Sequence, residues 1–172
     1  NGAGYWRDAV RSTKKNIVYA WGLNLVVLTL QIQPPWGGEP LGLPINMRLH
    51  RKNGDTLIEL AMKMINQLHQ WLPERRFRLV ADGFYATLAG KRMPQTHLVS
   101  RIQRNAKIFD LPPKRRKKTR GRPRKKGKRL ANPQKMTSYI HHWQQIEFCQ
   151  RGKTVKRLVY TRQVIWYWVS HQ

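Results

Sequence analysis

The fold is read most directly from residues 77–85, which run Phe77-Arg78-Leu79-Val80-Ala81-Asp82-Gly83-Phe84-Tyr85. Residues 77, 79 and 81 alternate with residues 78, 80 and 82, and the short run ends at a glycine, which predicts a buried strand of a sheet. Asp82 would then lie at the carboxyl end of that strand, where open α/β sheets place ligands and chemistry. An Asp-Gly pair after a strand is also a common turn. The position alone therefore leaves a catalytic and a structural role open.

The charge of the chain predicts a polyanionic partner. Its 172 residues carry a net charge of +26, while a hydrophobic content of 40% and seven tryptophans argue against a fully disordered protein. Nucleic acid would relieve the self-repulsion of so much positive charge, and a basic membrane-binding protein is the weaker alternative. The longest apolar run, residues 25–30, is too short to span a bilayer.

The remaining compositional features bear on compartment and length. The single cysteine, Cys149, allows neither an internal disulfide nor a Cys-x-x-Cys metal site, which suits a reducing compartment. No segment is typical of a signal peptide. The chain begins with Asn1 instead of methionine, which is typical of a processed protein or a fragment.

Strands are predicted upstream of Asp82. Residues 1–15 are polar and indicate a surface loop, and residues 17–21 and 25–32 are rich in β-forming residues. The second run is nearly continuous in apolar residues, so we expect a central strand covered on both faces. A Pro/Gly-rich break at 34–38 leads to another strand at 41–49, which suggests an antiparallel pair.

A helix is predicted between these strands and Asp82. Thr56 and Glu59 form a capping-box pattern, and Pro73 marks the end. We therefore assign Glu59 to the cap and not to catalysis. Six apolar residues fall on one face at helical spacing and predict its buried side: Leu57, Ala61, Met64, Ile65, Leu68 and Leu72.

Downstream of Asp82 the sequence predicts a short helical segment at 85–91 and a strand at 96–102. Residues 107–113 are expected to turn away from the core, with Pro112-Pro113 as a boundary. Beyond the basic run that follows, three more strands are predicted, at 146–149, 155–161 and 164–169.

The basic run occupies residues 114–129, where twelve of sixteen residues are Lys or Arg and none is acidic or aromatic. Such a run cannot pack a core. Its Arg120-Gly121-Arg122-Pro123 core can lie extended in the narrow minor groove of A·T-rich DNA, although a sequence-indifferent phosphate-binding loop or a nuclear localisation signal would have the same composition. The predicted DNA-binding residues are Arg115, Arg116, Lys117, Lys118, Arg120, Gly121, Arg122, Pro123, Arg124, Lys125, Lys126, Lys128 and Arg129.

Among the eight acids of the chain, Asp82 has the most site-like placement. Glu147 lies in a predicted strand and could pair with a nearby arginine. The six histidines show no metal-ligand spacing. Cys149 in a strand is more often a small core residue than a nucleophile.

Several pieces in order resemble the middle of a DDE-type transposase of bacterial insertion sequences, whose catalytic domain is RNase H-like. The resemblance covers nearly the whole chain, and the order of the pieces is more specific than any one of them. The pieces are Tyr19-Ala20-Trp21-Gly22-Leu23-Asn24, Leu43-Pro44 with Arg48-Leu49, Val80-Ala81-Asp82-Gly83-Phe84-Tyr85-Ala86, Val99-Ser100-Arg101 with Asn105-Ala106, Leu111-Pro112-Pro113, Arg120-Gly121-Arg122-Pro123 leading to Gly127-Lys128-Arg129-Leu130, and Trp166-Tyr167.

The resemblance implies a metal-dependent reaction on DNA. In that family three carboxylates hold two Mg²⁺ ions, which activate a water and then a 3′-hydroxyl for attack on DNA phosphodiesters. Asp82 matches the second acid. The first would precede Asn1 and the third would follow Gln172, and neither Asp8 nor Glu147 matches them. One carboxylate cannot hold two divalent cations against this much positive charge, so we predict that this polypeptide alone does not cut DNA.

The resemblance also implies an incomplete α/β fold, an RNase H-like mixed sheet with flanking helices that is interrupted by the basic segment and a β-rich insertion. We expect residues 1–111 to form a partial catalytic core, residues 112–135 a flexible basic segment, and residues 136–172 the insertion or a continuation of the core. The predicted function is that of a transposase fragment that binds DNA, both transposon ends and target, in the bacterial cytoplasm at the nucleoid, without a membrane. Oligomerisation is compatible with a full-length protein.

Two other readings remain open at the level of sequence. One is a non-enzymatic, AT-hook-like DNA-binding protein that uses the Arg-Gly-Arg-Pro segment. The other is an RNA-binding or ribosome-associated protein, which the charge alone would allow. The capped helix followed by an Asp-terminated strand favours the transposase, and the lack of aromatic residues in the basic run disfavours RNA.

Overall fold

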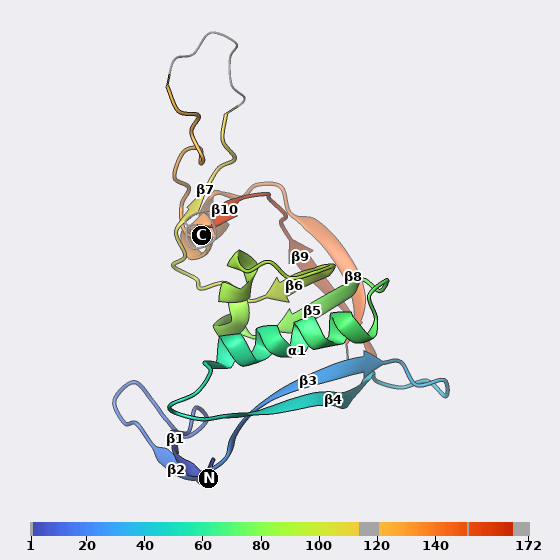
Figure 1. The fold of residues 1–172 in the computed structure, drawn as a ribbon. Coiled ribbons are helices and arrows are strands. Elements are labelled where there is room, and N and C mark those ends of the chain that lie inside the picture. The colour runs from blue at the N-terminus through green and yellow to red at the C-terminus, as the bar shows by residue number, and fades with distance from the viewer. Residues whose placement is uncertain (1, 114–120, 151, 167–172) are drawn as a thin grey trace. The chain divides into compact units, whose positions relative to one another are not determined.

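The computed structural model describes residues 2–113, 121–150 and 152–166, shown as coloured ribbon in Figure 1. The chain forms two compact units. The first comprises residues 1–76 with 93–95, and the second comprises residues 77–92 with 96–172. Each unit is described by itself below.

The first unit contains two antiparallel hairpins and one helix. Strand β1 (Gly4–Arg7) pairs with β2 (Tyr19–Gly22), and β3 (Asn24–Ile32) pairs with β4 (Leu41–His50). The predicted antiparallel pair at 25–32 and 41–49 is therefore confirmed. A register shift between Leu28 and Thr29 interrupts the long hairpin, and such irregularities bend a strand and increase its twist.

Two expectations for this unit are wrong. The stretch 1–15 is not only a loop, because residues 4–7 form strand β1 against a partner that begins twelve residues further on. Strand β3 is also not covered on both faces. Val26 is 6% exposed whereas Val27 is 46% exposed, and the strand has β4 as its partner in the described sheet. One face of β3 packs toward the core and the other stays open.

Helix α1 (Leu57–Trp71) covers one face of the β3–β4 hairpin, as Figure 1 shows. Its buried residues are Leu60, Ala61, Met64 and Ile65, so the predicted apolar face is confirmed at three positions, with Leu60 in addition. Gln67 Oε1 on the helix accepts hydrogen bonds from Asn46 Nδ2 at 2.8 Å and from Arg48 Nη2 at 2.9 Å on β4. These bonds give both side chains a partner on the helix, while the buried Arg48 Nε has no hydrogen-bond partner among the described residues.

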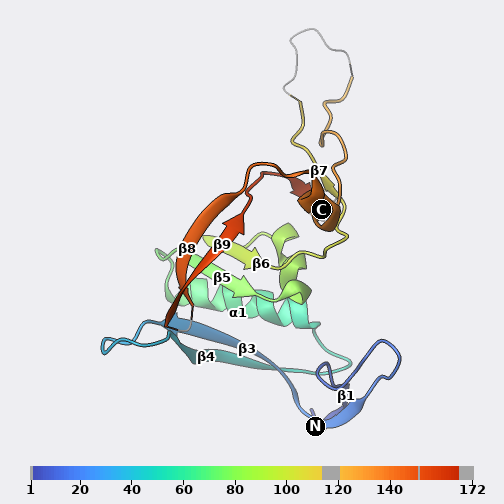
Figure 2. The ribbon, with the colours of Figure 1, turned by 180° about the vertical axis from the view of Figure 1, so that it is seen from behind.

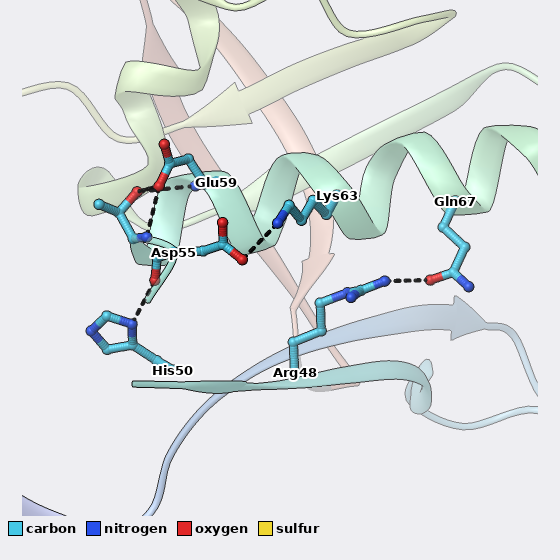
Figure 3. A network of polar contacts seen from close by, with 7 residues as sticks. Arg48, His50, Asp55, Glu59, Lys63 and Gln67 are labelled. Carbon is cyan, nitrogen blue, oxygen red and sulfur yellow. Dashed lines mark hydrogen bonds and ion pairs between the residues drawn. The ribbon is translucent and has the colours of Figure 1, made fainter. Parts of the chain in front are cut away.

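The predicted capping box at the start of α1 is present, and Figure 3 shows it beside the bonds to β4. Glu59 N donates to Thr56 Oγ1 at 3.3 Å, and Thr56 N donates to Glu59 Oε2 at 2.8 Å. Lys63 Nζ pairs with Asp55 Oδ2 at 2.6 Å, and His50 Nδ1 lies 2.9 Å from the carbonyl oxygen of Asp55. The helix start is thereby fixed to strand β4 by polar contacts.

Substitution of Thr56 by alanine is expected to destabilise the first unit by about 1 kcal/mol, the usual effect of losing a side-chain N-cap. Thr56→Ser keeps the hydroxyl and is the matched control. Urea unfolding followed by circular dichroism measures the difference. Equal midpoints for Thr56→Ala and the wild type would show that the cap does not limit stability.

The same cap makes stability depend on pH. The hydrogen bonds from Thr56, backbone first, lower the pKa of Glu59. A lowered folded-state pKa contributes stability that is present above the ordinary glutamate value and is lost as the pH falls through the lowered value. Glu59→Gln removes the titrating carboxylate and should therefore flatten the loss of stability on acidification, whereas Thr56→Ala keeps the backbone N–H that lowers this pKa most and should flatten it only in part.

The second unit is built around a parallel strand pair. Strand β5 (Phe77–Ala81) pairs in parallel with β6 (Thr96–Ser100), and the 3₁₀ helix η1 (Gly83–Gly90) connects them. The predicted strands and the short helical segment are confirmed. However, β5 is not a buried strand, because Val80 is 71% exposed and the described sheet gives β5 one partner.

The core of this unit contains a stretch that was expected to leave it. Its buried residues are Ala86 and Leu88 on η1 together with Ala106 and Ile108. Strand β7 (Ile108–Phe109) pairs with β10 (Ile165–Trp166). The expectation that residues 107–113 turn away from the core is thus wrong for Ile108, which is 4% exposed because β10 holds it in place.

The late strands form a hairpin that Figure 2 shows from behind. Strand β8 (Gln144–Gln150) pairs with β9 (Lys153–Val159), which confirms the first two of the three predicted late strands. The short helices α2 (Pro133–Met136) and η2 (Thr137–Tyr139) precede it, and Asn132 caps α2. Residues 167–169 of the predicted last strand lie outside the described residues.

The fold class is mixed α/β, with short two-stranded sheets and few helices in the described part of the chain. The RNase H-like arrangement of a complete sheet remains a prediction. In the same described ranges, no helix has the length and apolarity that crossing a membrane requires.

Candidate functional site

Asp82 lies at the carboxyl end of β5, at the position that the sequence predicts. The register pairs Ala81 with Ser100, so the two parallel strands end side by side. Asp82 follows the first of these ends and Arg101 follows the second. The Ser100 Oγ donates to the Asp82 carbonyl at 2.7 Å, which joins the two strand ends. The site is therefore positioned by the parallel pair, as ligand sites in open α/β sheets are.

The carboxylate of Asp82 has one structural bond and one open oxygen. Its Oδ1 accepts from Phe84 N at 3.0 Å, so Asp82 is the N-cap of η1. The turn reading and the site reading of the Asp-Gly pair are thus both compatible with the structure. Within the described residues, Oδ2 makes no hydrogen bond or ion pair. That oxygen is available to a cation.

The pKa of Tyr85 is affected by the charge of the neighbouring Asp82. Burial of the phenol, and secondarily the negative charge of Asp82, raise the pKa of Tyr85. Both effects disfavour a phenolate. The side chain therefore stays neutral near the carboxylate at physiological pH.

Most of the other acids are engaged in local structure. Asp8 Oδ1 accepts from Val10 N and Arg11 N at 2.9 and 3.0 Å. Asp55 and Glu59 belong to the helix start described above. Asp110 Oδ2 pairs with Arg162 Nη2 at 3.1 Å.

Glu147 also has a structural partner, although not the one expected. It pairs with Lys156 Nζ at 2.8 Å across the β8–β9 hairpin, where an arginine was predicted. The register aligns Glu147 directly with Lys156, whereas Arg157 faces Ile146. Opposite charges placed directly across a strand pair stabilise it.

Within the described residues of either unit, the acids do not gather into a metal centre. No group of three His, Cys, Asp or Glu side chains that could hold a metal ion occurs in the described ranges, which include all eight acids. Cys149 is exposed on β8, contrary to the expectation of a core residue. A pair of divalent ions needs several oxygen ligands in a defined geometry. The single carboxylate of Asp82 does not fit such a pair.

The predicted DNA-binding segment is only partly described. Arg115, Arg116, Lys117, Lys118 and Arg120 lie outside the described residues. The described members of the set, most of them exposed, are Gly121, Arg122, Pro123, Arg124, Lys125, Lys126, Lys128 and Arg129. Gly121 has a φ of 100°, a conformation that strongly favours glycine.

Both sides of the basic segment meet in a hydrogen-bonded neck, which we define as residues 108–111 and 126–130. Asp110 N donates to the Lys128 carbonyl at 2.9 Å, Gly127 N donates to the Asp110 carbonyl at 2.9 Å, and Leu130 N donates to the Ile108 carbonyl at 3.0 Å. No feature of the sequence predicts this pairing. Residues that are fifteen or more positions apart in the chain thus lie side by side.

Side chains reinforce the neck. Lys126 Nζ lies 4.4 Å from the centre of the Phe109 ring, a cation–π distance. Arg162, which precedes β10, binds the Asp110 carboxylate and connects the neck to the segment between β9 and β10. The neck holds the described end of the basic segment on the folded unit.

The comparison with protein families identifies the chain. The family model described as DDE superfamily endonuclease matches residues 49–165, more than half of the chain, and the match contains Asp82, the parallel pair and the neck. No curated protein and no solved structure matches significantly. The extent of the family match shows that this chain belongs to the DDE superfamily of endonucleases.

Proposed function

We propose that this chain is part of a bacterial insertion-sequence transposase, in which it supplies one metal-binding carboxylate and a DNA-binding surface. Membership in the DDE endonuclease family implies DNA as the substrate. The observation that carries the proposal is the position of Asp82, with an open carboxylate oxygen at the joined ends of two parallel strands. In this proposal the protein acts in the cytoplasm at the nucleoid.

Asp82 has the role of the second acid of the metal site. Its backbone is fixed by the bond from Ser100 and its Oδ1 by the bond from Phe84, so Oδ2 is held in place for a cation. Magnesium, when bound by the full set of acids, would supply Lewis-acid activation of the DNA phosphate. In this proposal the remaining ligands of such a site are further carboxylates.

The basic segment supplies affinity for the DNA backbone. Its described cations Arg122, Arg124 and Lys125 are exposed. Without the twelve cations of residues 114–129 the net charge would still be +14, because 26 minus 12 is 14. The electrostatic attraction is therefore spread over the protein, and the segment adds a concentrated contact to it.

The alternative is a DNA-binding protein without enzymatic activity. The Gly121 backbone has a φ of 100° and no side chain, so it suits a close approach to a DNA groove. This supports the DNA binding that the alternative requires. The two proposals differ in what flanks the coding sequence. An Asp-terminated strand upstream, a helix-borne glutamate downstream and terminal inverted repeats are expected only for the transposase.

The purified 172-residue chain is expected to bind plasmid DNA in the presence of Mg²⁺ without nicking it. The reason is that no group of three possible metal ligands occurs in the described residues, so Asp82 lacks the further carboxylates that a metal pair needs. Conversion of supercoiled to open-circular plasmid on agarose gels measures cleavage. Mg²⁺-dependent nicking that Asp82→Ala abolishes would contradict the expected lack of activity. A chain that fails to bind DNA at all would contradict the proposed function.

A further inference from the structure

The hairpin of β1 and β2 presents three aromatic side chains on one face. The register sets Tyr5 opposite Trp21 and Arg7 opposite Tyr19. Residues two apart on a strand, and residues directly opposite across a pair, share a face. Tyr5, Tyr19 and Trp21 are 61%, 61% and 64% exposed. We call the face made by these three rings and Arg7 the aromatic face.

Ring contacts support the hairpin that carries the aromatic face. The Tyr5 and Trp21 rings meet edge to face with centroids 5.0 Å apart. On the opposite face of β1, the Trp6 ring lies 5.0 Å from the His50 ring, and Lys52 Nζ lies 5.6 Å from the Trp6 ring centre. The Tyr5 and Trp21 rings are therefore held against each other while both remain exposed.

The loop between the two strands is also fixed. Ser12 Oγ donates to the Val18 carbonyl at 3.1 Å and accepts from Val18 N at 3.0 Å. Asp8 N donates to the Val18 carbonyl at 2.9 Å, which continues the strand pairing by one step. The side chain of Asp8 is taken up by the loop backbone, as described above. These hydrogen bonds fix the loop end of the hairpin.

The surroundings of the aromatic face are cationic. Arg7 lies on the face itself, and Arg11, Lys14 and Lys15 are exposed on the connecting loop. The acid of this hairpin, Asp8, is paired with Arg11, with Asp8 Oδ2 at 3.6 Å from Arg11 Nε. Exposed rings bordered by cations complement a strand of bases joined by phosphates.

We propose that the aromatic face binds unpaired bases of single-stranded DNA by stacking, a step beyond duplex binding that rests on DNA being the substrate. Tyr19 and Trp21 are two residues apart on β2, so their side chains are set about 6.6 Å apart along the strand. That spacing is about twice the ~3.4 Å rise per nucleotide of a DNA strand. One base fits between the two rings, and Arg7 and the loop cations contact the neighbouring phosphates.

Three oligonucleotides of equal length test the proposal on the unmodified chain: a thymine single strand, an abasic single strand with the same phosphates, and a duplex. Fluorescence anisotropy gives the three dissociation constants. Stacking of one base is expected to make the thymine strand bind about 5- to 150-fold more tightly than the abasic strand. Equal affinities for these two strands would overturn the proposal, whereas duplex binding tests the proposed function separately.

Variants locate the contact. Tyr19→Ala combined with Trp21→Ala should reduce the preference for thymine over abasic strands to near one, while Tyr19→Phe combined with Trp21→Phe retains the preference. Trp36→Ala is the matched control, because Trp36 is 80% exposed and lies in the loop between β3 and β4. A loss with Trp36→Ala as large as that of the double alanine variant would overturn the assignment. A double alanine variant that changes the oligomeric state and leaves the thymine preference intact would show that the face binds protein instead.

Discussion

Replacement of Arg122, Arg124 and Lys125 by glutamine is expected to weaken duplex binding by up to a few hundredfold at ~0.1 M salt. Each phosphate contact of a lysine or arginine contributes about 0.9 to the slope of log K against log salt. Three contacts therefore lower the slope by up to about 2.7. At ~0.1 M salt each contact then contributes a factor of about eight. These three side chains are exposed beyond the neck and make no ion pair in the described residues.

The matched control replaces three cations elsewhere on the surface. Arg75, Arg76 and Arg92 are exposed and lie outside the basic segment. Both triple variants have the same net charge, so they differ only in where the charge is lost. A salt titration of each variant by fluorescence anisotropy gives the slope and the affinity. An equal loss in the control would show that net charge, and not the basic segment, governs binding.

The same titration, repeated with A·T-rich and G·C-rich duplexes, tests groove reading. A minor-groove contact through Arg120-Gly121-Arg122-Pro123 predicts tighter binding to the A·T-rich duplex, because its narrow groove has the more negative potential. The triple variant contains Arg122→Gln and should lose much of that preference. Equal affinity of the wild type for the two duplexes would leave phosphate attraction as the whole of the interaction.

The elements that sequence predicted well are those whose signals are local. The capping residues Thr56 and Glu59 and the break at Pro73 bracket α1 to within two residues. The hairpin of β3 and β4 follows from two β-rich runs around a Pro/Gly turn. Asp82 was placed at a strand end by alternation and a following glycine, and the structure has it there.

The elements that sequence missed depend on distant partners. Strand β1 has only four residues, and a polar loop separates it from its partner Tyr19–Gly22. A short strand in a polar stretch has no clear pattern in the sequence. Ile108 becomes a core residue through β10, more than fifty positions away, so the prolines that follow it gave the wrong impression of a boundary. The open face of β3 could not be predicted either, since an apolar run does not say how many neighbours the strand has.

In the candidate site, too, the features with local sequence signals were predicted and those that depend on distant partners were not. The position of Asp82 depends on local sequence and was predicted, whereas the lack of DNA cleavage by this chain alone remains a prediction. The bond from Ser100 to Asp82 depends on the parallel register of β5 and β6, which the strand patterns alone do not specify. The neck was not predicted because it pairs residues that are distant in the sequence, and a run of basic residues does not indicate which backbone groups pair.

Gly127 is the position where the neck can be tested most sharply. A Cβ added there would collide with the carbonyl oxygen of Leu111 and would lie 2.9 Å from the carbonyl oxygen of Asp110. Both atoms belong to the backbone, so no side chain can rotate to relieve the contact. Asp110 is also the acceptor of the Gly127 N–H and the donor to Lys128. Alanine at this position must therefore separate the two sides of the neck.

We expect Gly127→Ala to destabilise the second unit by about 1–3 kcal/mol, the usual range for overpacking. For a unit of this size that corresponds to a Tm lower by roughly 5–20 °C. Gly22→Ala is the control, because a Cβ there meets nothing within 4 Å and its φ is not positive. Thermal unfolding by circular dichroism compares the two variants with the wild type.

The DNA affinity of Gly127→Ala separates two roles of the neck. The substitution removes no charge, so a basic segment that acts only as a string of cations would bind duplex DNA with unchanged affinity below the Tm. If the neck positions the segment, ordering it on DNA costs conformational entropy that the wild type has already lost on folding. We therefore expect a lower affinity with an unchanged salt slope. A Tm equal to that of Gly22→Ala, together with wild-type affinity, would show that the neck neither stabilises the unit nor positions the segment.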